Sequence, residues 1–148
     1  MTIEENLRAF MQDYHRAIAD KNFAAVAEFL EFPFEITLKG GEVKLRDTAD
    51  VVEAFSVIAK VHRARGVKKV RRRVHLVHAT SLSEAIVSTD EEALDEKGQP
   101  IVTWRSSYLL LRQRGIWRIA EANAVNHDEV WEKVGATSLH AASASSLC

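Results

Sequence analysis

The sequence predicts one α+β domain, in which three N-terminal helices pack inside a strongly curved antiparallel sheet. The chain has 148 residues, the usual length of a single compact domain, and 47% of them are hydrophobic. Apolar residues recur at helical spacing in the first half of the chain. After Gly66 the pattern changes to long segments rich in β-branched and aromatic residues with short turns between them.

The first two helices form a predicted hairpin. Residues 3–20 place apolar side chains on one face, which indicates an amphipathic helix with a buried stripe. A second helix is predicted from about Phe23 to Leu30, with Asn22 as its N-cap. Pro33 is expected to end it, because the residue before a proline is pushed out of helical geometry.

Two short strands and a third helix follow this hairpin. The strands are expected at Phe34–Leu38 and Val43–Leu45, with a Gly-Gly turn between them. Asp47 or Thr48 can cap the third helix, and Gly66 is expected to stop it.

Four long strands with tight turns predict an antiparallel meander in the second half of the chain. The segments are Val67–Thr80, Glu84–Leu94, Ile101–Arg112 and Ile116–Val125. Three helices cannot all lie behind a flat sheet of this size, so we expect the sheet to bend around them. A helical turn is expected at His127–Val134, and the domain is predicted to span residues 1–135, followed by a disordered Ser/Ala-rich tail at 136–148.

Composition argues against several classes of function. The formal net charge is −1, and the one cysteine is Cys148, so neither nucleic-acid binding nor a disulfide scaffold is indicated. The start MTIEENLRAF is acidic and amphipathic, unlike a secretory leader, and no apolar run suits a membrane span. We therefore expect a cytoplasmic protein with no membrane association. Phosphate-binding loops and metal-ligand spacings are missing from the sequence, so no cofactor and no metal are predicted.

The basic run 68–73 is the one feature that suggests nucleic acid. It lacks aromatic interleaving, and the chain as a whole is not basic. We expect it to balance Glu91, Glu92, Asp95 and Glu96 on the next strand, with no specific binding of nucleic acid.

The order of elements and several residues resemble the nuclear transport factor 2 superfamily, which includes the SnoaL-like proteins. The residues that carry the resemblance are Tyr14, Asn22-Phe23, Phe32-Pro33-Phe34, Ser107-Tyr108-Leu109-Leu110 and Gly115-Ile116-Trp117-Arg118-Ile119-Ala120. The resemblance covers about residues 3–128 and implies a cone-shaped α+β fold. It is nearly silent on function, because the superfamily holds isomerases, dehydratases, cyclases, hydrolases, transport factors and assembly domains.

The last hairpin predicts which residues line a pocket. If Arg114-Gly115 is a two-residue turn, Tyr108 pairs with Glu121 and Ser106 with Asn123. The concave face would then carry Trp104, Ser106, Tyr108, Leu110, Trp117, Ile119, Glu121 and Asn123. Phe10 is expected to reach the same pocket from the first helix. The other face would carry Ser107, Leu109, Leu111, Ala120, Ala122 and Ala124, a smooth surface that predicts a homodimer.

Glu121, Tyr108 and Tyr14 are the candidate catalytic residues. A carboxylate in an apolar cup has a raised pKa and can act as a general base. The alternative is that Glu121 lies solvated at the rim or is tied to Tyr108 or an arginine. The resemblance to steroid isomerases of the superfamily implies an oxyanion-binding tyrosine at Tyr14. It fails at their catalytic aspartate, whose place falls near Leu38, and a buried core tyrosine remains the alternative for Tyr14.

Two classes of function stay open. The first is a pocket protein for a hydrophobic or mixed-polarity small molecule, including a cofactor-independent isomerase or lyase. The second is a non-catalytic dimerisation or partner-binding domain, whose pocket is unused or merely holds a ligand.

Overall fold

A six-stranded mixed sheet organises the fold. This computed structural model describes residues 2–134, and the strand order is β2-β1-β6-β5-β4-β3. The strands are β1 Leu30–Leu38, β2 Gly41–Leu45, β3 Lys69–Ala79, β4 Glu84–Leu94, β5 Pro100–Gln113 and β6 Ile116–Asn123. Every neighbouring pair is antiparallel except β1 and β6, which run parallel. The predicted α+β fold with a curved sheet is confirmed, and the sheet is mixed instead of antiparallel throughout, because the end of the meander returns to run parallel to the first strand.

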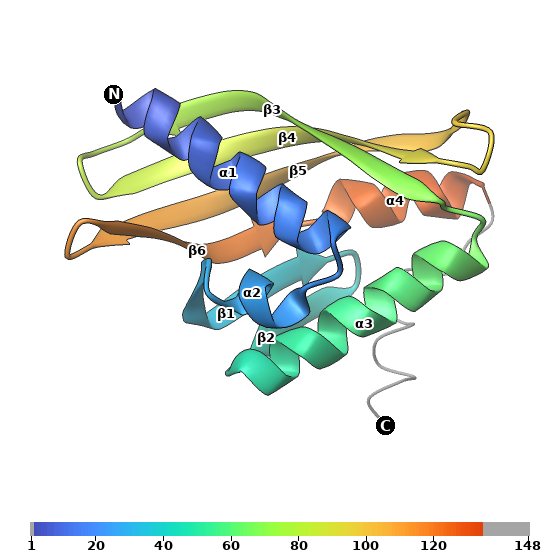
Figure 1. Ribbon diagram of the computed structural model, residues 1–148, viewed down its shortest axis with the longest axis horizontal. Coiled ribbons are helices and arrows are strands. Elements are labelled where there is room, and N and C mark those ends of the chain that lie inside the picture. Colours follow the sequence, from blue (N-terminus) through green and yellow to red (C-terminus); the bar gives the residue numbers. More distant parts are fainter. Residues whose placement is uncertain (1, 135–148) are drawn as a thin grey trace.

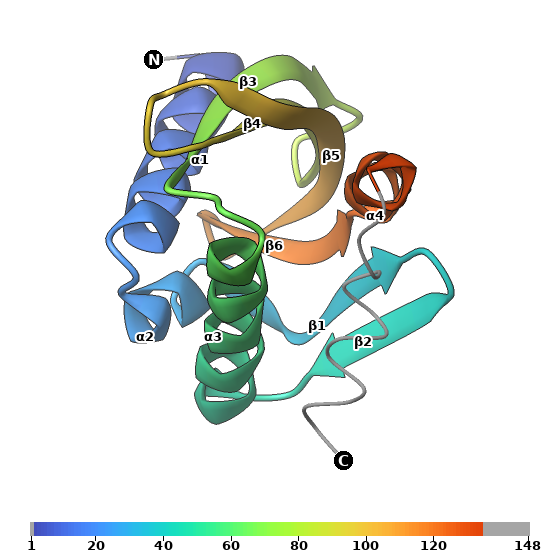
Figure 2. The same cartoon turned by 90° about the vertical axis from the view of Figure 1, so that its right-hand side faces the viewer.

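Four helices accompany the sheet within residues 2–134. Figures 1 and 2 show how they are arranged around it. Figure 2 shows the sheet arching from β3 to β6, with α1 and α3 on its open side. The end of α3 lies beside α4, where their histidines meet, and α2 follows α1 closely. The helices are α1 Ile3–Ala19, α2 Phe23–Ala27, α3 Thr48–Ala64 and α4 Val125–Lys133.

Helix caps confirm the predicted starts of α2 and α3. The Asn22 side chain accepts a hydrogen bond from the amide of Ala25 at 3.3 Å. Asp47 does the same for the amide of Asp50 at 2.9 Å. Each cap satisfies a backbone donor that the first turn of a helix leaves free.

The end of α2 differs from the prediction. The helix stops at Ala27, and Pro33 lies inside β1 instead of terminating a helix. β1 begins at Leu30, earlier than predicted, because this segment pairs with β6. The amide of Ile119 donates to the carbonyl of Phe29, and Leu30 pairs with Ile119. The pairing is irregular between Leu30 and Glu35, which accommodates a proline that has no N–H to donate.

A bulge in β6 changes the register of the last hairpin. The predicted pairing holds from Gln113 with Ile116 to Leu110 with Ile119. Ala120 is then an extra residue on β6, so that Leu109 pairs with Glu121 and Tyr108 pairs with Ala122. The predicted pairs Tyr108–Glu121 and Ser106–Asn123 are therefore wrong. Beyond the bulge, Ala122 of β6 and Ala124, just after the strand, line the concave side in place of the predicted polar residues.

The core fills the space between α1, α3 and the concave face of the sheet. Its fully buried side chains include Leu7, Met11, Val26, Phe34, Val51, Val87, Leu110 and Ile119. A smaller cluster joins Ala93, Trp104 and Trp131 where α4 meets β5. Within residues 2–134, none of the helices is both long and apolar enough to cross a membrane. The predicted disordered tail at 136–148 lies outside the described residues.

Candidate functional site

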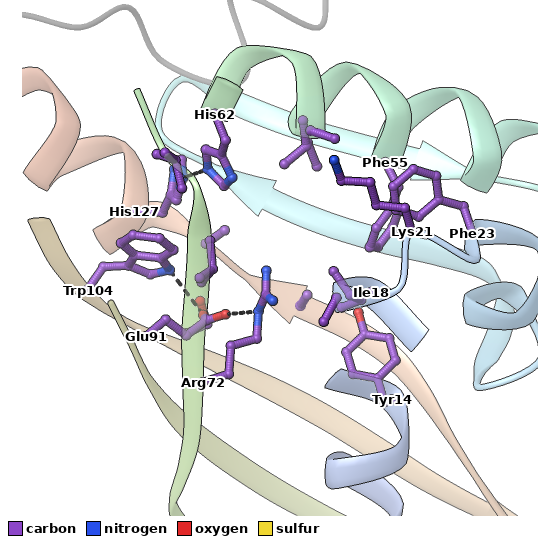
Figure 3. Close-up of a pocket in the computed structure, with 18 of the residues that line it drawn as sticks. Tyr14, Ile18, Lys21, Phe23, Phe55, His62, Arg72, Glu91, Trp104 and His127 are labelled. Atoms are coloured by element: carbon purple, nitrogen blue, oxygen red, sulfur yellow. Dashed lines mark hydrogen bonds and ion pairs between the residues drawn. The ribbon is translucent and has the colours of Figure 1, made fainter. Parts of the chain in front are cut away.

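A cavity of about 250 Å³ opens between α1, α3 and the concave side of the sheet. Figure 3 shows side chains from both helices and from the strands converging on it. Its lining is mostly apolar and aromatic, with a few polar groups, which is the usual character of small-molecule sites. The residues that line it include Tyr14, Phe55, His62, Arg72, Glu91, Trp104, Tyr108, Ala122 and His127.

A buried ion pair forms one wall of this cavity. Arg72 Nε on β3 donates to Glu91 Oε1 on β4 at 2.8 Å, and their side chains are only 13% and 4% exposed. Trp104 Nε1 on β5 donates to the other carboxylate oxygen of Glu91 at 3.0 Å. Three adjacent strands are therefore joined through one carboxylate. Removing a single partner would leave a buried charge unpaired, which typically costs ~3–5 kcal/mol.

Two tyrosines face the cavity from opposite elements. Tyr14 on α1 and Tyr108 on β5 pack edge to face, with ring centroids 6.1 Å apart. Burial raises the pKa of the Tyr14 phenol, although the positive charge of Arg72 opposes this effect. Burial, followed by the charge of Glu91, raises the pKa of Tyr108 as well. Both phenols remain protonated at neutral pH and can donate hydrogen bonds.

A histidine pair lies where α3 meets α4. His62 Nε2 and His127 Nε2 are 2.9 Å apart, so one ring donates a proton to the lone pair of the other. Burial, with His127 as the second cause, lowers the pKa of His62 to about 3. If His62 is the donor, the proton of His127 lies on Nδ1, 3.6 Å from Asp128 Oδ1. In the described part of the chain, no three metal-binding side chains gather at this pair or elsewhere.

Four exposed cations surround the opening of the cavity, and we call them the mouth cations. They come from the α1–α2 connection, the last turn of α3 and the start of β3, and they are Lys21, Arg63, Lys68 and Lys69. Figure 3 shows Lys21 extending toward the cavity beside Phe55. Across residues 2–134, no salt bridge within 4 Å is recorded for any of the four.

The structure brings together four of the residues that the sequence assigned to the pocket. Tyr14, Trp104, Ser106 and Tyr108 all line the cavity. Phe10 and Ile119 instead belong to the core, where Phe10 packs edge to face on Phe29 at 5.4 Å. The predictions for Phe10 and Ile119 as pocket residues are therefore wrong, because α1 and β6 turn these side chains into the packed region beside the cavity.

Glu121 and Asn123 do not reach the cavity. Both are exposed, and the bulge at Ala120 turns them toward the convex face. The Asn123 side chain instead accepts a hydrogen bond from the amide of Val125 at 3.1 Å, at the start of α4. The predicted placement of Glu121 as an inward carboxylate is wrong, and the catalytic role built on it loses its geometric basis.

The sequence reasoning missed Arg72, Glu91, His62 and His127 as cavity residues. Arg72 belongs to the basic run, which is predicted to balance acidic residues on the next strand. The structure confirms this for Arg71, which pairs with Glu92 outside the sheet, and for Arg72, whose pair with Glu91 lies inside. Alternation along β3 carries every second residue of the run inward, and this signal could have singled out Arg72 and its partner Glu91.

The family of the chain follows from a family model described as NTF2-like protein (DUF6841), which matches residues 2–127. This match spans more than half of the sequence and agrees with the helices and curved sheet described above. The chain therefore belongs to this NTF2-like family. No curated protein matches the sequence significantly.

Solved structures support the fold at low sequence identity. A domain of unknown function with a cystatin-like fold from Nostoc punctiforme matches with a TM-score of 0.67 and 14% identity, over 83% of this chain and 77% of that one. A putative calcium/calmodulin-dependent protein kinase II association domain from Xanthomonas campestris gives 0.62 and 14%, over 83% and 86%. A ketosteroid isomerase-like protein from Erwinia carotovora atroseptica gives 0.60 and 16%, over 78% and 88%. At such identities these matches establish the fold alone.

Acid should destabilise the protein through its buried histidines. Burial, with Arg72 as the second cause, lowers the pKa of His15 to about 4, and that of His62 is about 3, both from an ordinary 6.5. As the pH falls below ~6.5, the unfolded chain binds protons that the folded protein refuses. The free energy of unfolding should then fall by up to ~1.4 kcal/mol per pH unit for each group, and most of the loss should occur between pH ~6.5 and ~4.

Urea denaturation at a series of pH values between 7.5 and 4.5 measures this loss. His15→Leu should make the decline shallower, because it removes one of the two groups. Gln12→Leu, at an exposed position on the same helix, should leave it as steep as in the native sequence. An unchanged slope in His15→Leu would contradict the assignment.

Proposed function

We propose that this NTF2-like protein binds a small molecule of mixed polarity in the cavity between α1, α3 and the concave sheet. The observation that carries the proposal is the cavity itself, about 250 Å³ of space bordered by aromatic rings and by a few buried polar groups. A domain that needed only a packed core would gain stability by filling such a space, since cavities cost free energy.

The polar groups of the cavity favour binding over proton abstraction. Among the described lining residues, Glu91 is the one carboxylate, and each of its oxygens already accepts a hydrogen bond, from Arg72 and from Trp104. A general base needs a lone pair directed at the substrate proton, whereas these bonds direct the Glu91 carboxylate toward its two partners. The chemistry available without rearrangement is hydrogen-bond donation from Arg72 and Tyr14, which suits recognition of a ligand.

Blocking the cavity should prevent ligand binding. Ala122→Leu adds bulk to the concave side of β6, opposite Tyr108, and should weaken binding of the neutral fluorophore N-phenyl-1-naphthylamine at least ~10-fold. Glu121→Leu, on the adjacent but outward position, is the matched control and should leave the affinity unchanged. Fluorescence titration checks both. Equal affinity of the native protein and of Ala122→Leu would show that the fluorophore binds outside this cavity and would contradict the proposed site.

We also propose that the convex face of the sheet forms a homodimer. Bulge geometry removes Ala122 and Ala124 from the patch predicted for this face, since both line the cavity. Leu109 and Leu111 on β5 remain, and β3 and β4 add Leu76 and Ile86, which are 54% and 38% exposed. Exposed apolar side chains gathered on one sheet face often mark a protein interface.

Sedimentation velocity at micromolar concentration tests this proposal. The native protein should sediment as a dimer, and Leu109→Glu should shift it toward monomer, because the new carboxylate would be buried at the interface. Val52→Glu is a suitable control, since Val52 is an exposed apolar residue on α3, away from the convex face. A native protein that sediments as a monomer would refute the proposed homodimer.

A further inference from the structure

The lining of the cavity is basic, although the whole chain is not. Its basic side chains are the mouth cations and Arg72, five in all, against a single acidic side chain, Glu91, among the lining residues described. The complete sequence carries a formal net charge of −1. Positive charge is thus concentrated at this site, although the net charge of the whole chain is slightly negative. A cleft lined by charges of one sign attracts ligands of the opposite sign.

Arg72 offers donors that the protein itself does not use. Its Nε is bound to Glu91, while no hydrogen bond from its two terminal nitrogens is found within residues 2–134. Figure 3 shows these nitrogens directed into the cavity, with the Tyr14 hydroxyl facing the same space. A planar guanidinium with two free N–H groups matches the two oxygens of a carboxylate.

Glu91 cannot easily take that place. One of its oxygens is held by Arg72 Nε and the other by Trp104 Nε1, so its carboxylate is fixed between β3 and β5. Moving it over the terminal nitrogens of Arg72 would break the bond to Trp104 and leave a buried indole N–H unpaired, which is costly. The free side of the guanidinium is therefore available to a ligand.

The rest of the cavity suits an apolar body. Its apolar lining includes the side chains of Ile18, Phe23, Phe34, Phe55 and Ile58. We infer that the ligand is a small apolar monocarboxylic acid, whose carboxylate binds the terminal nitrogens of Arg72 while its body fills the space between α1 and α3. This inference rests on the proposed binding function and specifies the class of its ligand.

Two probes of nearly equal shape separate the charge from the apolar body. 1-Naphthylacetate is an anion at pH 7.5, and 1-naphthylacetamide is its neutral counterpart. Isothermal titration calorimetry at ~0.1 M salt should show the acid binding at least ~10-fold more tightly than the amide, the size expected for hydrogen bonds between charged groups.

Variants of the ion pair locate the carboxylate. Arg72→Gln alone would leave Glu91 buried without a partner, so the test uses Arg72→Gln with Glu91→Gln, which removes both charges together. This double variant should bring the acid and the amide to within about twofold of each other. Glu91→Gln alone keeps Arg72 and removes the negative charge beside it, so the variant that remains folded should show an increased preference for the acid.

The mouth cations supply the matched comparison. Lys68→Gln with Lys69→Gln should slow association of the acid and weaken its salt dependence, yet leave most of the preference for acid over amide. If this pair abolishes the preference and the Arg72 double variant does not, the anion binds at the opening and the inference is wrong.

Binding of the probes to the native protein separates the inference about the carboxylate from the proposed binding function on which it rests. Equal binding of the acid and the amide would overturn the inference and leave a neutral-ligand pocket standing. If neither probe nor the neutral fluorophore binds, both the inference and the proposed function fail.

Discussion

The curvature of the sheet is the constraint on which the rest of the structure depends, and irregular pairing accompanies it in four places. Register shifts occur within the pairs β1–β6, β3–β4, β4–β5 and β5–β6. An extra residue on one strand increases local twist and bends that strand, which allows six strands to arch over α1 and α3 instead of lying flat. The bends also decide which side chains face the cavity, because each bulge resets the alternation of faces. At Ala120 this reset turns Glu121 outward and Ala122 inward.

A second constraint acts within the arch. Glu91 binds Arg72 on one neighbouring strand and Trp104 on the other, so the register of β3, β4 and β5 is fixed by one buried carboxylate. A slip by one residue would turn both charges to the wrong face and leave them without partners, at a cost of several kcal/mol. Replacement by apolar residues is often neutral or stabilising for such pairs, so stability alone does not explain a buried charge here. The proposed binding of a ligand carboxylate by Arg72 would give this charge a function.

Much of the fold could be predicted from the sequence because its signals are local. The spacing of apolar residues predicts the helices, and Asn22 and Asp47 predict where two of them begin. The turn at Arg114-Gly115 predicts the first residue pairs of the last hairpin. The parallel pairing of β1 with β6 was not predictable in this way, since it joins segments more than eighty residues apart. The bulge at Ala120 has no local signal either, because alanine is compatible with both a regular and a bulged strand. The wrong placements of Glu121 and Asn123 in the candidate site both follow from that one residue.

The charged residues of the cavity were missed for a different reason. When a run of basic residues on a strand is treated as one charged segment, it predicts a solvated surface. This treatment overlooks that successive side chains of a strand point to opposite faces of the sheet. Read by faces, the run separates into Arg71, which pairs with Glu92 outside, and Arg72, which pairs with Glu91 inside. The same two-residue period that placed Trp104, Ser106 and Tyr108 correctly therefore also contained the inward ion pair. What the period could not supply was the register, because the pairing of Arg72 with Glu91 depends on a bulge between Val74 and Leu76 in the β3–β4 hairpin. A buried ion pair can be inferred from alternation only when the register of the opposite strand is also known.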